Sequence, residues 1–406
     1  MSFVKNKNSN TAAYIFLLLF VSTEFLGSNY VGIISVRNFA VCAMFLYILL
    51  PLKKITFPKI NEKELKLLGG YYLWVLFIGL FNGLYDNIGL TIAMGRFLPS
   101  MLIPIFFLKY VKSKNAFHKI LITLIIILCI NCFVSILQGI NHPLGWKIPM
   151  LFQNKNAMDN TLSFMDENYE NSIGKSVVSG LFSTPVINGY FIAAFGILFP
   201  IPIILKRNIK SVILSFIIFL LSIVALFFIQ QRSAFYIYAL LSTIILIILF
   251  FKQLNYILML ITLIMIIVVV MLSNNISIEW GRLADISDAG RDELRYNFHV
   301  FFSDNLILGN RSKFIELYGL TPHNLIAETF LLGGIIGLLI YLCFIIVLAI
   351  DLIKSLKSSD ILITLTMLST IIIIGISLTH SIGYHTGLTL GMYAFTFNTL
   401  SKKFAN

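Results

Sequence analysis

One stretch of the chain places ionisable and polar residues at the start of a strongly apolar segment. Residues 321–342 read TPHNLIAETFLLGGIIGLLIYL, with His323, Asn324 and Glu328 in the first third. Burying an unpaired ionisable group in hydrocarbon costs several kcal/mol, so such residues at a membrane boundary are candidate functional residues. The preceding threonine and proline mark a helix N-terminus, where the helix dipole favours a neutral His323. A neutral imidazole can accept a proton and therefore serve as a general base.

Two features of this segment bear on that hypothesis. Glu328 lies about 140° around the helix from His323, so we expect it to balance an arginine or to orient a neighbouring side chain. Gly333, Gly334 and Gly337 remove side-chain bulk further along, which predicts close helix packing. The alternative for His323 is a histidine whose nitrogens are satisfied at the interface by water and backbone.

Arginines supply the second kind of candidate chemistry. Arg37 and Arg96 lie within apolar segments, Arg232 stands in QQRSAF at the end of another, and Arg291 lies in a long polar segment. The planar guanidinium holds oxyanions such as phosphate through two parallel hydrogen bonds. Each arginine alone is equally compatible with a structural partner for a carbonyl or carboxylate, or with snorkelling to the interface. Together they favour an anion-binding site, because few acidic residues are predicted at the same depth.

Residues 288–305, DAGRDELRYNFHVFFSDN, predict an amphipathic helix that starts at Asp288. The spacing places Arg291, Arg295 and His299 on one face. The apolar positions are Leu294, Phe298, Phe301 and Phe302. We expect this helix at the membrane interface, where its charged face is either simply solvated or an anion-binding stripe.

The composition identifies the class of protein that must position these residues. Hydrophobic residues make up 58% of the 406 positions and charged residues 12%, which excludes a soluble globule. Runs of about 20 apolar residues, long enough to span a bilayer, recur along the chain. The prediction is an all-α integral membrane protein of a single domain, residues 1–406, with about twelve transmembrane helices. The expected spans are 11–27, 30–50, 69–85, 89–110, 117–138, 184–205, 211–230, 234–251, 255–273, 324–350, 360–379 and 383–400.

The distribution of lysines predicts the orientation of these spans. Lysines concentrate at both termini and in the loops after even-numbered spans, which are therefore expected in the cytoplasm. Two sizeable extracytoplasmic loops follow, 139–183 and 274–322, on the same side as the candidate arginines and His323. The turn with His380 and His385 is expected on that side too. The net charge of +12 is then a topology signal, and no nucleic acid is expected as a partner.

The cysteines indicate neither a disulfide framework nor a metal site. All four lie inside expected spans, and Cys129 and Cys132 are interpreted as packing residues of an apolar helix. No glycine-rich nucleotide loop is present in the sequence. We expect neither a metal nor a cofactor.

The candidate residues and their order resemble the O-antigen ligase and O-antigen polymerase superfamily of bacterial envelope glycosyltransferases. HNLIAETFLLGGIIG matches the motif that opens a helix after the long outer loop of that family. DNLILGN corresponds to the segment that precedes this motif in the family, but it lacks the proline that is usual there. QQRSAF and LFSTPVINGYFIAAFGIL resemble two stretches of the family's central helices, with Gln231 where a Ser or Thr is common. The resemblance covers residues 181–345, whereas the first five spans match only in number and hydropathy.

The resemblance implies a metal-independent glycosyltransferase that uses an undecaprenyl-diphosphate-linked glycan at the periplasmic face of the bacterial inner membrane. It implies His323 as the base that activates the acceptor, and Arg232 and Arg291 as the residues that hold the diphosphate. Further candidate substrate contacts are Arg295, Asn324 and Glu328, with Arg37 and Arg96 suggested by this sequence alone.

The acceptor and the competing classes stay open at this point. Two long outer loops favour a polymerase, which elongates a second lipid-linked glycan; a ligase would use lipid A-core or a protein. A chain-length regulator or another envelope assembly protein is an expected partner. The non-enzymatic alternative is a lipid-linked oligosaccharide flippase, although the polar residues of this chain gather at one face rather than at mid-membrane.

Overall fold

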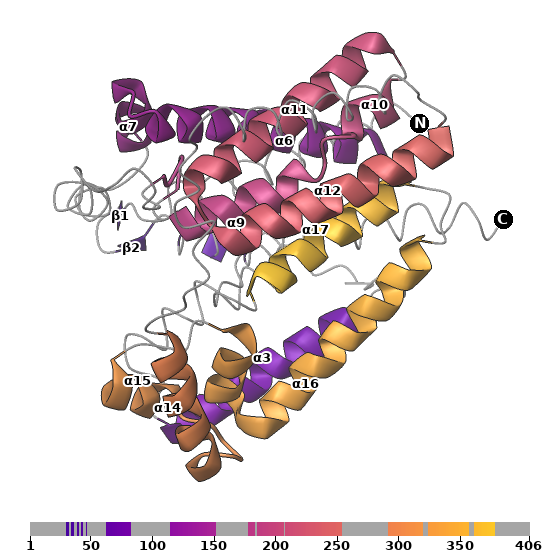
Figure 1. Ribbon diagram of the computed structural model, residues 1–406. Helices are drawn as coiled ribbons and strands as arrows, with labels where there is room; N and C mark the ends of the chain where they lie inside the picture. The colour runs from indigo at the N-terminus through magenta and orange to yellow at the C-terminus, as the bar shows by residue number, and fades with distance from the viewer. Residues whose placement is uncertain are drawn as a thin grey trace. The chain divides into compact units, whose positions relative to one another are not determined.

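The computed structural model describes residues 30–31, 34–35, 39, 42–43, 46, 62–82, 114–151, 178–182, 185–206, 208–253, 291–319, 324–356 and 361–377. These ranges are almost entirely helical (Figure 1). The chain divides into two compact units, residues 1–123 with 287–406, and residues 124–286. The candidate residues from the long loop and the HN motif belong to the first unit, and Arg232 belongs to the second.

Among the described residues, the first unit contains one short strand pair and five helices that are wholly its own. Strands β1 (Tyr30–Val31) and β2 (Ile34–Ser35) pair antiparallel, so the span expected from residue 30 does not begin there as a helix. The helices are α3 (Glu62–Asn82), α14 (Arg291–Asp304), α15 (Arg311–Tyr318), α16 (Leu325–Leu356) and α17 (Ile361–Ser377).

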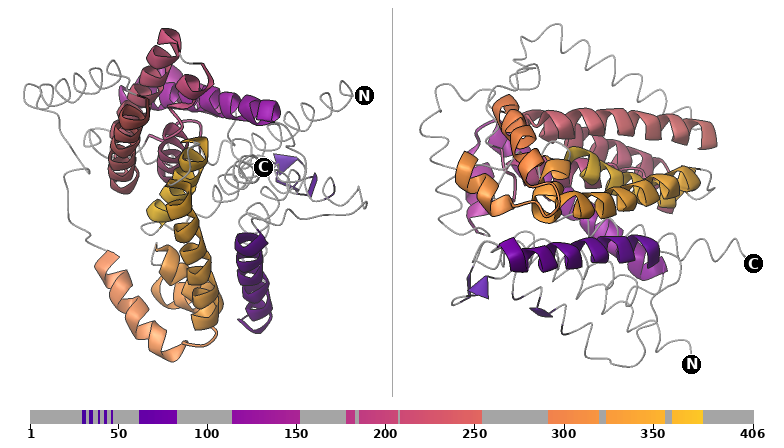
Figure 2. Two further views of the ribbon diagram at one scale, coloured as in Figure 1. Left: turned by 90° about the vertical axis from the view of Figure 1, so that its right-hand side faces the viewer. Right: turned by 90° about the horizontal axis from the view of Figure 1, so that it is seen from below.

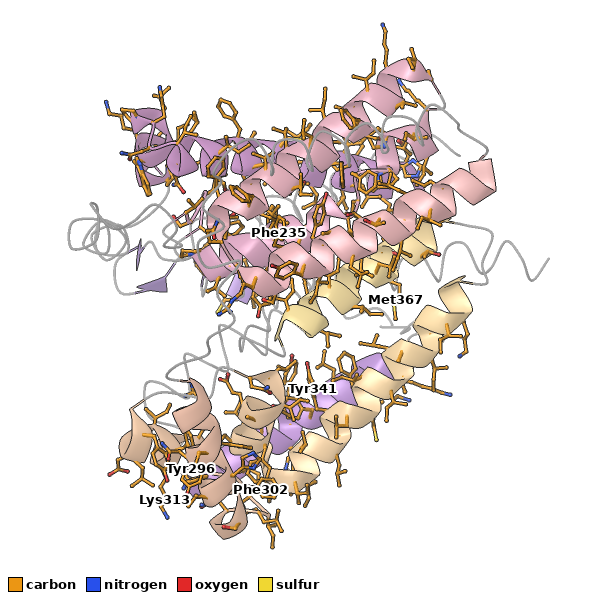
Figure 3. All side chains as sticks on the ribbon, in the orientation of Figure 1. Phe235, Tyr296, Phe302, Lys313, Tyr341 and Met367 are labelled. Atoms are coloured by element: carbon orange, nitrogen blue, oxygen red, sulfur yellow. The ribbon has the colours of Figure 1, made fainter. Side chains whose placement is uncertain are left out.

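The core of the first unit forms where α3 and α16 run side by side (Figures 1 and 2). Tyr71 of α3 meets Tyr341 of α16 with ring centroids 5.1 Å apart, and Tyr341 lies on the side of α16 that faces α3 (Figure 3). Trp74 packs over Gly333 and Gly337, and its Nε1 donates a hydrogen bond to the carbonyl oxygen of Gly333 at 2.7 Å. The predicted close packing at these glycines is therefore confirmed, with the indole filling the space that side chains would occupy.

Among the described residues, the second unit contains five whole helices and most of a sixth, α6. They are α6 (Lys114–Gly139), α7 (Pro143–Met150), α9 (Pro185–Gly196), α10 (Ile201–Leu205), α11 (Ile209–Ile229) and α12 (Arg232–Gln253). α9 lies against α11 and α12 and is buried along its length, as the central helix of this unit (Figure 1). Its core side chains include Phe191 and Phe195, whose rings pack in a tilted arrangement with centroids 4.7 Å apart.

The described helices agree with a membrane protein. Four of them are long and apolar enough to cross a bilayer: Phe117–Gly139, Pro185–Leu205, Ile209–Ile229 and Leu325–Asp351. Three shorter apolar helices cover Lys66–Gly79, Arg232–Ile247 and Thr364–Ile376. Together these coincide with the expected spans 69–85, 117–138, 184–205, 211–230, 234–251, 324–350 and 360–379. The spans 11–27, 89–110, 255–273 and 383–400 lie outside the described residues.

Two of the coinciding spans are broken, which the hydropathy pattern did not predict. The span from Pro185 is interrupted at residues 197–200, where tight turns separate α9 from α10 around Pro200 and Pro202. The long helix α16 breaks at Gly334, whose φ of 61° and ψ of −163° are not helical. Apolarity over about 20 residues predicts a span but not its continuity, since neighbouring segments can satisfy freed backbone groups.

Candidate functional site

The start of α16 is fixed by Asn324. Its side-chain oxygen accepts hydrogen bonds from the backbone N–H groups of Ile326 at 2.9 Å and Ala327 at 3.2 Å. This is an N-cap, and it satisfies two amides that the helix itself leaves without acceptors. The helix predicted to start at the His-Asn pair therefore begins directly after Asn324. His323 itself lies outside the described residues.

Glu328, in the first turn of α16, is buried and forms an ion pair with Arg311. The guanidinium Nε donates to the carboxylate Oε1 at 3.3 Å, and the two side chains are only 11% and 4% exposed. Arg311 is the first residue of α15, so the pair joins the beginnings of two helices. A buried pair of this kind tolerates little movement of either partner, because separation would leave a charge uncompensated in a poorly solvated site.

The residue after Glu328 ties a third helix to the same turn. Thr329 donates its hydroxyl hydrogen to the carbonyl oxygen of Leu325 at 2.6 Å, and its side chain lies beside Tyr71 of α3. Helices α3, α15 and α16 therefore meet at the first turns of α16. The position of Asn324 is therefore set from two sides.

The connection between α14 and α15 contacts the break in α16. The backbone N–H of Ile335 donates to the carbonyl oxygen of Leu306 at 2.9 Å instead of to its own helix. A Cβ on Gly334 would collide with the carbonyl of Ile307, and a Cβ on Gly309 would collide with the carbonyl of Phe330. Both glycines also have positive φ, 61° and 63°, which other residues rarely adopt. The sequence segments DNLILGN and HNLIAETFLLGGIIG thus lie against each other.

Helix α14 covers the same region with its apolar face. Phe298, Phe301 and Phe302 pack with Phe314 of α15 and Phe330 of α16, with the rings of Phe302 and Phe330 4.4 Å apart. The predicted helix and the predicted apolar positions 298, 301 and 302 are confirmed. Tyr296 and His299 are exposed on α14, and Tyr296 and Phe302 are marked in Figure 3.

In the second unit Arg232 is the first residue of α12. α11 ends at Ile229 and α12 begins three residues later, so the connection is very short. It consists of Gln230 and Gln231. Gln230 adopts the left-handed conformation with φ 58° and caps α11 by donating to the carbonyl oxygen of Phe227. Arg232 is partly buried beside this turn. A non-glycine residue in this conformation is uncommon and clusters at functional positions.

A buried polar network lies near the same turn, between α6 and α9. Asn131 donates from Nδ2 to Asn188 Oδ1 at 2.7 Å, and Asn188 donates to Ser135 Oγ at 3.0 Å. Gln138 accepts from the N–H of Gly180 at 2.8 Å and donates to the carbonyl of Gly145 at 3.0 Å. The network holds residues 178–182 against the ends of α6 and α9. Polar groups that satisfy each other in this way fix one arrangement of the chain.

The structure describes the predicted site residues to different extents. Asn324 and Glu328 lie in the first turn region of α16, and Arg232 begins α12. Arg291 and Arg295 lie in α14, but their side chains are outside the described residues, as are Arg37, Arg96, His380 and His385 entirely.

Two elements of the site were missed from the sequence. Helix α15 was treated as loop, although Asn310 caps it by accepting from Lys313 N–H at 3.0 Å and Gly319 follows its end. Asn before and Gly after a short segment are helix boundary signals that would have revealed it, and Arg311 with it. The network of Asn131, Gln138 and Asn188 was also missed, although an amide within an apolar span is itself a signal.

Within the described residues, no three His, Cys, Asp or Glu side chains come together as a metal site would require. What the first unit offers is a rigidly held start of α16, directly after His323. A scan against protein-family models finds no match, and a search of curated proteins finds no similar sequence.

Proposed function

We propose that this protein is a metal-independent membrane glycosyltransferase that transfers a glycan from an undecaprenyl-diphosphate donor. The acceptor is a second lipid-linked glycan, so the protein acts as a surface-polysaccharide polymerase. The proposed setting is the periplasmic side of a bacterial inner membrane, with about twelve spans and both termini in the cytoplasm. One observation carries the proposal most: the HN segment opens a helix that is anchored by Arg311 and by the DNLILGN segment.

In the proposed reaction His323 takes the proton from an acceptor hydroxyl as its oxygen bonds to the anomeric carbon of the donor. The bond between that carbon and the diphosphate oxygen breaks, and undecaprenyl diphosphate leaves. Arg232 and Arg291 stabilise the negative charge that grows on the leaving group, with Arg37, Arg96 and Arg295 as further contacts. Asn324 and Glu328 support this chemistry by fixing the start of α16, because Asn324 Oδ1 caps the helix and Glu328 Oε1 accepts from Arg311.

A second candidate function has an observation of its own. Broken spans are typical of transporters, and both the span at Pro185–Leu205 and α16 are interrupted. A lipid-linked oligosaccharide flippase would use such breaks to bind its cargo. A ligase that uses lipid A-core or a protein acceptor shares the proposed donor chemistry and differs only in the acceptor.

The deciding experiment measures glycan transfer by the purified full chain in detergent, from an undecaprenyl-diphosphate glycan, with chelator present. We expect transfer by the wild type and loss of about 10²–10⁴-fold in His323→Ala, the range that general base assistance contributes. His142→Ala is the matched control, since this histidine is exposed at the start of α7 and is not part of the proposed site. A chelator-sensitive wild type, or a His323→Ala variant with normal turnover, would refute the mechanism.

The same assay separates the candidate functions. Arg232→Lys and Arg291→Lys keep the charge but lose the planar fork, so each is expected to lose about ten- to a hundredfold in rate. Lys313→Arg, at an exposed position of α15, is the control for effects of substitution and purification that do not involve the site (Figure 3). A wild type that moves intact donor across liposomes without transferring its glycan would favour the flippase. Transfer only to lipid A-core would favour the ligase.

A further inference from the structure

Gln231 occupies an unusual position in the second unit. It lies in the two-residue connection between α11 and α12, beside Arg232, and is only 7% exposed. Neither its amide nitrogen Nε2 nor its oxygen Oε1 has a hydrogen-bond partner among the residues that the structure describes. Most buried polar side chains are hydrogen bonded, and leaving one unsatisfied costs free energy. A glutamine at this position therefore needs a reason beyond packing.

The space that the carboxamide of Gln231 occupies depends on a glycine of the neighbouring helix α9. Its Oε1 lies directly against Gly189 of α9, where any side chain would collide with it. The hydroxyl of Ser233, in the first turn of α12, is a further buried atom without a partner in the described ranges. The polar network of Asn131 and Asn188 lies one residue away along α9, yet it closes on itself and does not extend to Gln231.

The two unpartnered atoms define what a ligand must offer. Nε2 is a donor and needs an acceptor, whereas Oε1 is an acceptor and needs a donor. A fully ionised phosphate presents acceptors alone and would leave Oε1 unsatisfied. Sugar hydroxyl groups both donate and accept, so neighbouring hydroxyls on one ring can satisfy both atoms of a carboxamide.

We propose that Gln231 forms a sugar-binding subsite that hydrogen bonds hydroxyl groups of the donor sugar adjacent to the diphosphate. The inference rests on the proposed function, in which Arg232 holds that diphosphate. The neighbouring positions in the chain then contact neighbouring parts of one ligand, with the guanidinium on the anionic group and the carboxamide on the first sugar. Gly189 serves the subsite by leaving space for the carboxamide.

The test uses the purified full chain in detergent and follows its melting temperature with two probes. One is undecaprenyl diphosphate, and the other is undecaprenyl diphosphate that carries one sugar. The wild type is expected to gain stability with both and more with the second. Gln231→Met, similar in shape and without the polar atoms, is expected to melt higher than wild type without ligand. It should keep the shift with the bare lipid and lose the additional shift from the sugar.

Ser215→Ala is the matched control. Ser215 is buried in α11 with an unpartnered hydroxyl within the described residues, but it lies near the opposite end of that helix from Gln230. This variant should also melt higher without ligand, and it should retain both ligand shifts.

Several results would overturn the subsite. A Gln231→Met variant that keeps the sugar-dependent shift refutes the contact. Loss of the shift with the bare lipid as well would assign Gln231 to the diphosphate instead, and a lower melting temperature without ligand would make the carboxamide a packing group. A wild type that responds to neither lipid would refute the proposed function itself, whereas the other outcomes leave that function standing.

Discussion

Arg311 and Glu328 form the buried ion pair on which the start of α16 depends. Removing one partner leaves the other charge uncompensated, which typically costs about 3–5 kcal/mol. We expect Arg311→Met to lower the free energy of unfolding by about this amount. The double variant Arg311→Met with Glu328→Leu should recover most of the loss, because no charge is then left buried. Chemical denaturation in detergent measures both.

An ion pair of the same unit whose lysine is largely exposed provides the control for this cycle. Lys354 and Asp351 are 3.0 Å apart, and their side chains are 61% and 12% exposed. Lys354→Met is therefore expected to cost about 0–1 kcal/mol. Equal losses at the two sites would show that burial of the Arg311–Glu328 pair has no energetic consequence.

Asn324 allows a separation of helix capping from substrate contact. Asn324→Ala removes the cap and is expected to cost about 1 kcal/mol, with lower transfer activity because the chain next to His323 loosens. Asn324→Asp keeps the capping oxygen and adds a charge that the helix N-terminus favours. We expect this variant to keep both stability and activity in melting and transfer assays. A stable but inactive aspartate variant would mean that the amide N–H groups of Asn324 bind substrate.

At the scale of elements, the contact between residues 305–310 and the break in α16 makes two glycines irreplaceable. Gly309→Ala and Gly334→Ala each combine positive φ with a collision against backbone. We expect either change to destabilise the protein by more than about 1 kcal/mol, the usual cost of a Cβ in this conformation. Thermal melting in detergent measures the effect.

Gly70 of α3 is the control for these glycines. A Cβ there would meet nothing within 4 Å, and the residue is helical. Gly70→Ala should therefore raise stability by about 0.5–1 kcal/mol. If the alanine at position 334 were tolerated as well as that at position 70, the described break in α16 would be incorrect.

The elements also show what sequence patterns could and could not predict. Apolar length correctly predicted the spans that became α6, α11 and α16, and periodicity predicted which phenylalanines of α14 pack against α15 and α16. Neither pattern predicts a break, because the acceptor for Ile335 N–H comes from Leu306, in a segment distant along the chain. The sequence predicted an arginine as one possible partner of Glu328, and this is confirmed, but it did not identify Arg311, because that depends on how two helices meet.

At the scale of the whole molecule, orientation in the membrane is the most direct prediction to test. Cysteine labelling on a background without the four native cysteines reports it. The loop assignment places position 296 outside, where Tyr296 is 69% exposed on α14, and the lysine distribution places position 354 in the cytoplasm. Tyr296→Cys should label in intact spheroplasts, and Lys354→Cys only after permeabilisation.

The reverse labelling pattern would place His323 on the cytoplasmic side and exclude the proposed periplasmic reaction. Leu151→Cys offers an independent check in the second unit, since Leu151 is 78% exposed at the end of α7 and should label like position 296. If positions 151 and 296 label under the same condition, one reagent has tested the sidedness of both units.

The break in α16 also constrains how this sequence can diverge in evolution. Leu306 and Ile335 meet through backbone atoms, so their side chains can drift while the contact persists. Gly309 and Gly334 cannot drift, and a charge reversal at Arg311 must be compensated at Glu328. Distant homologues should therefore share this pair of glycines and this covarying pair of charges even where little other identity survives.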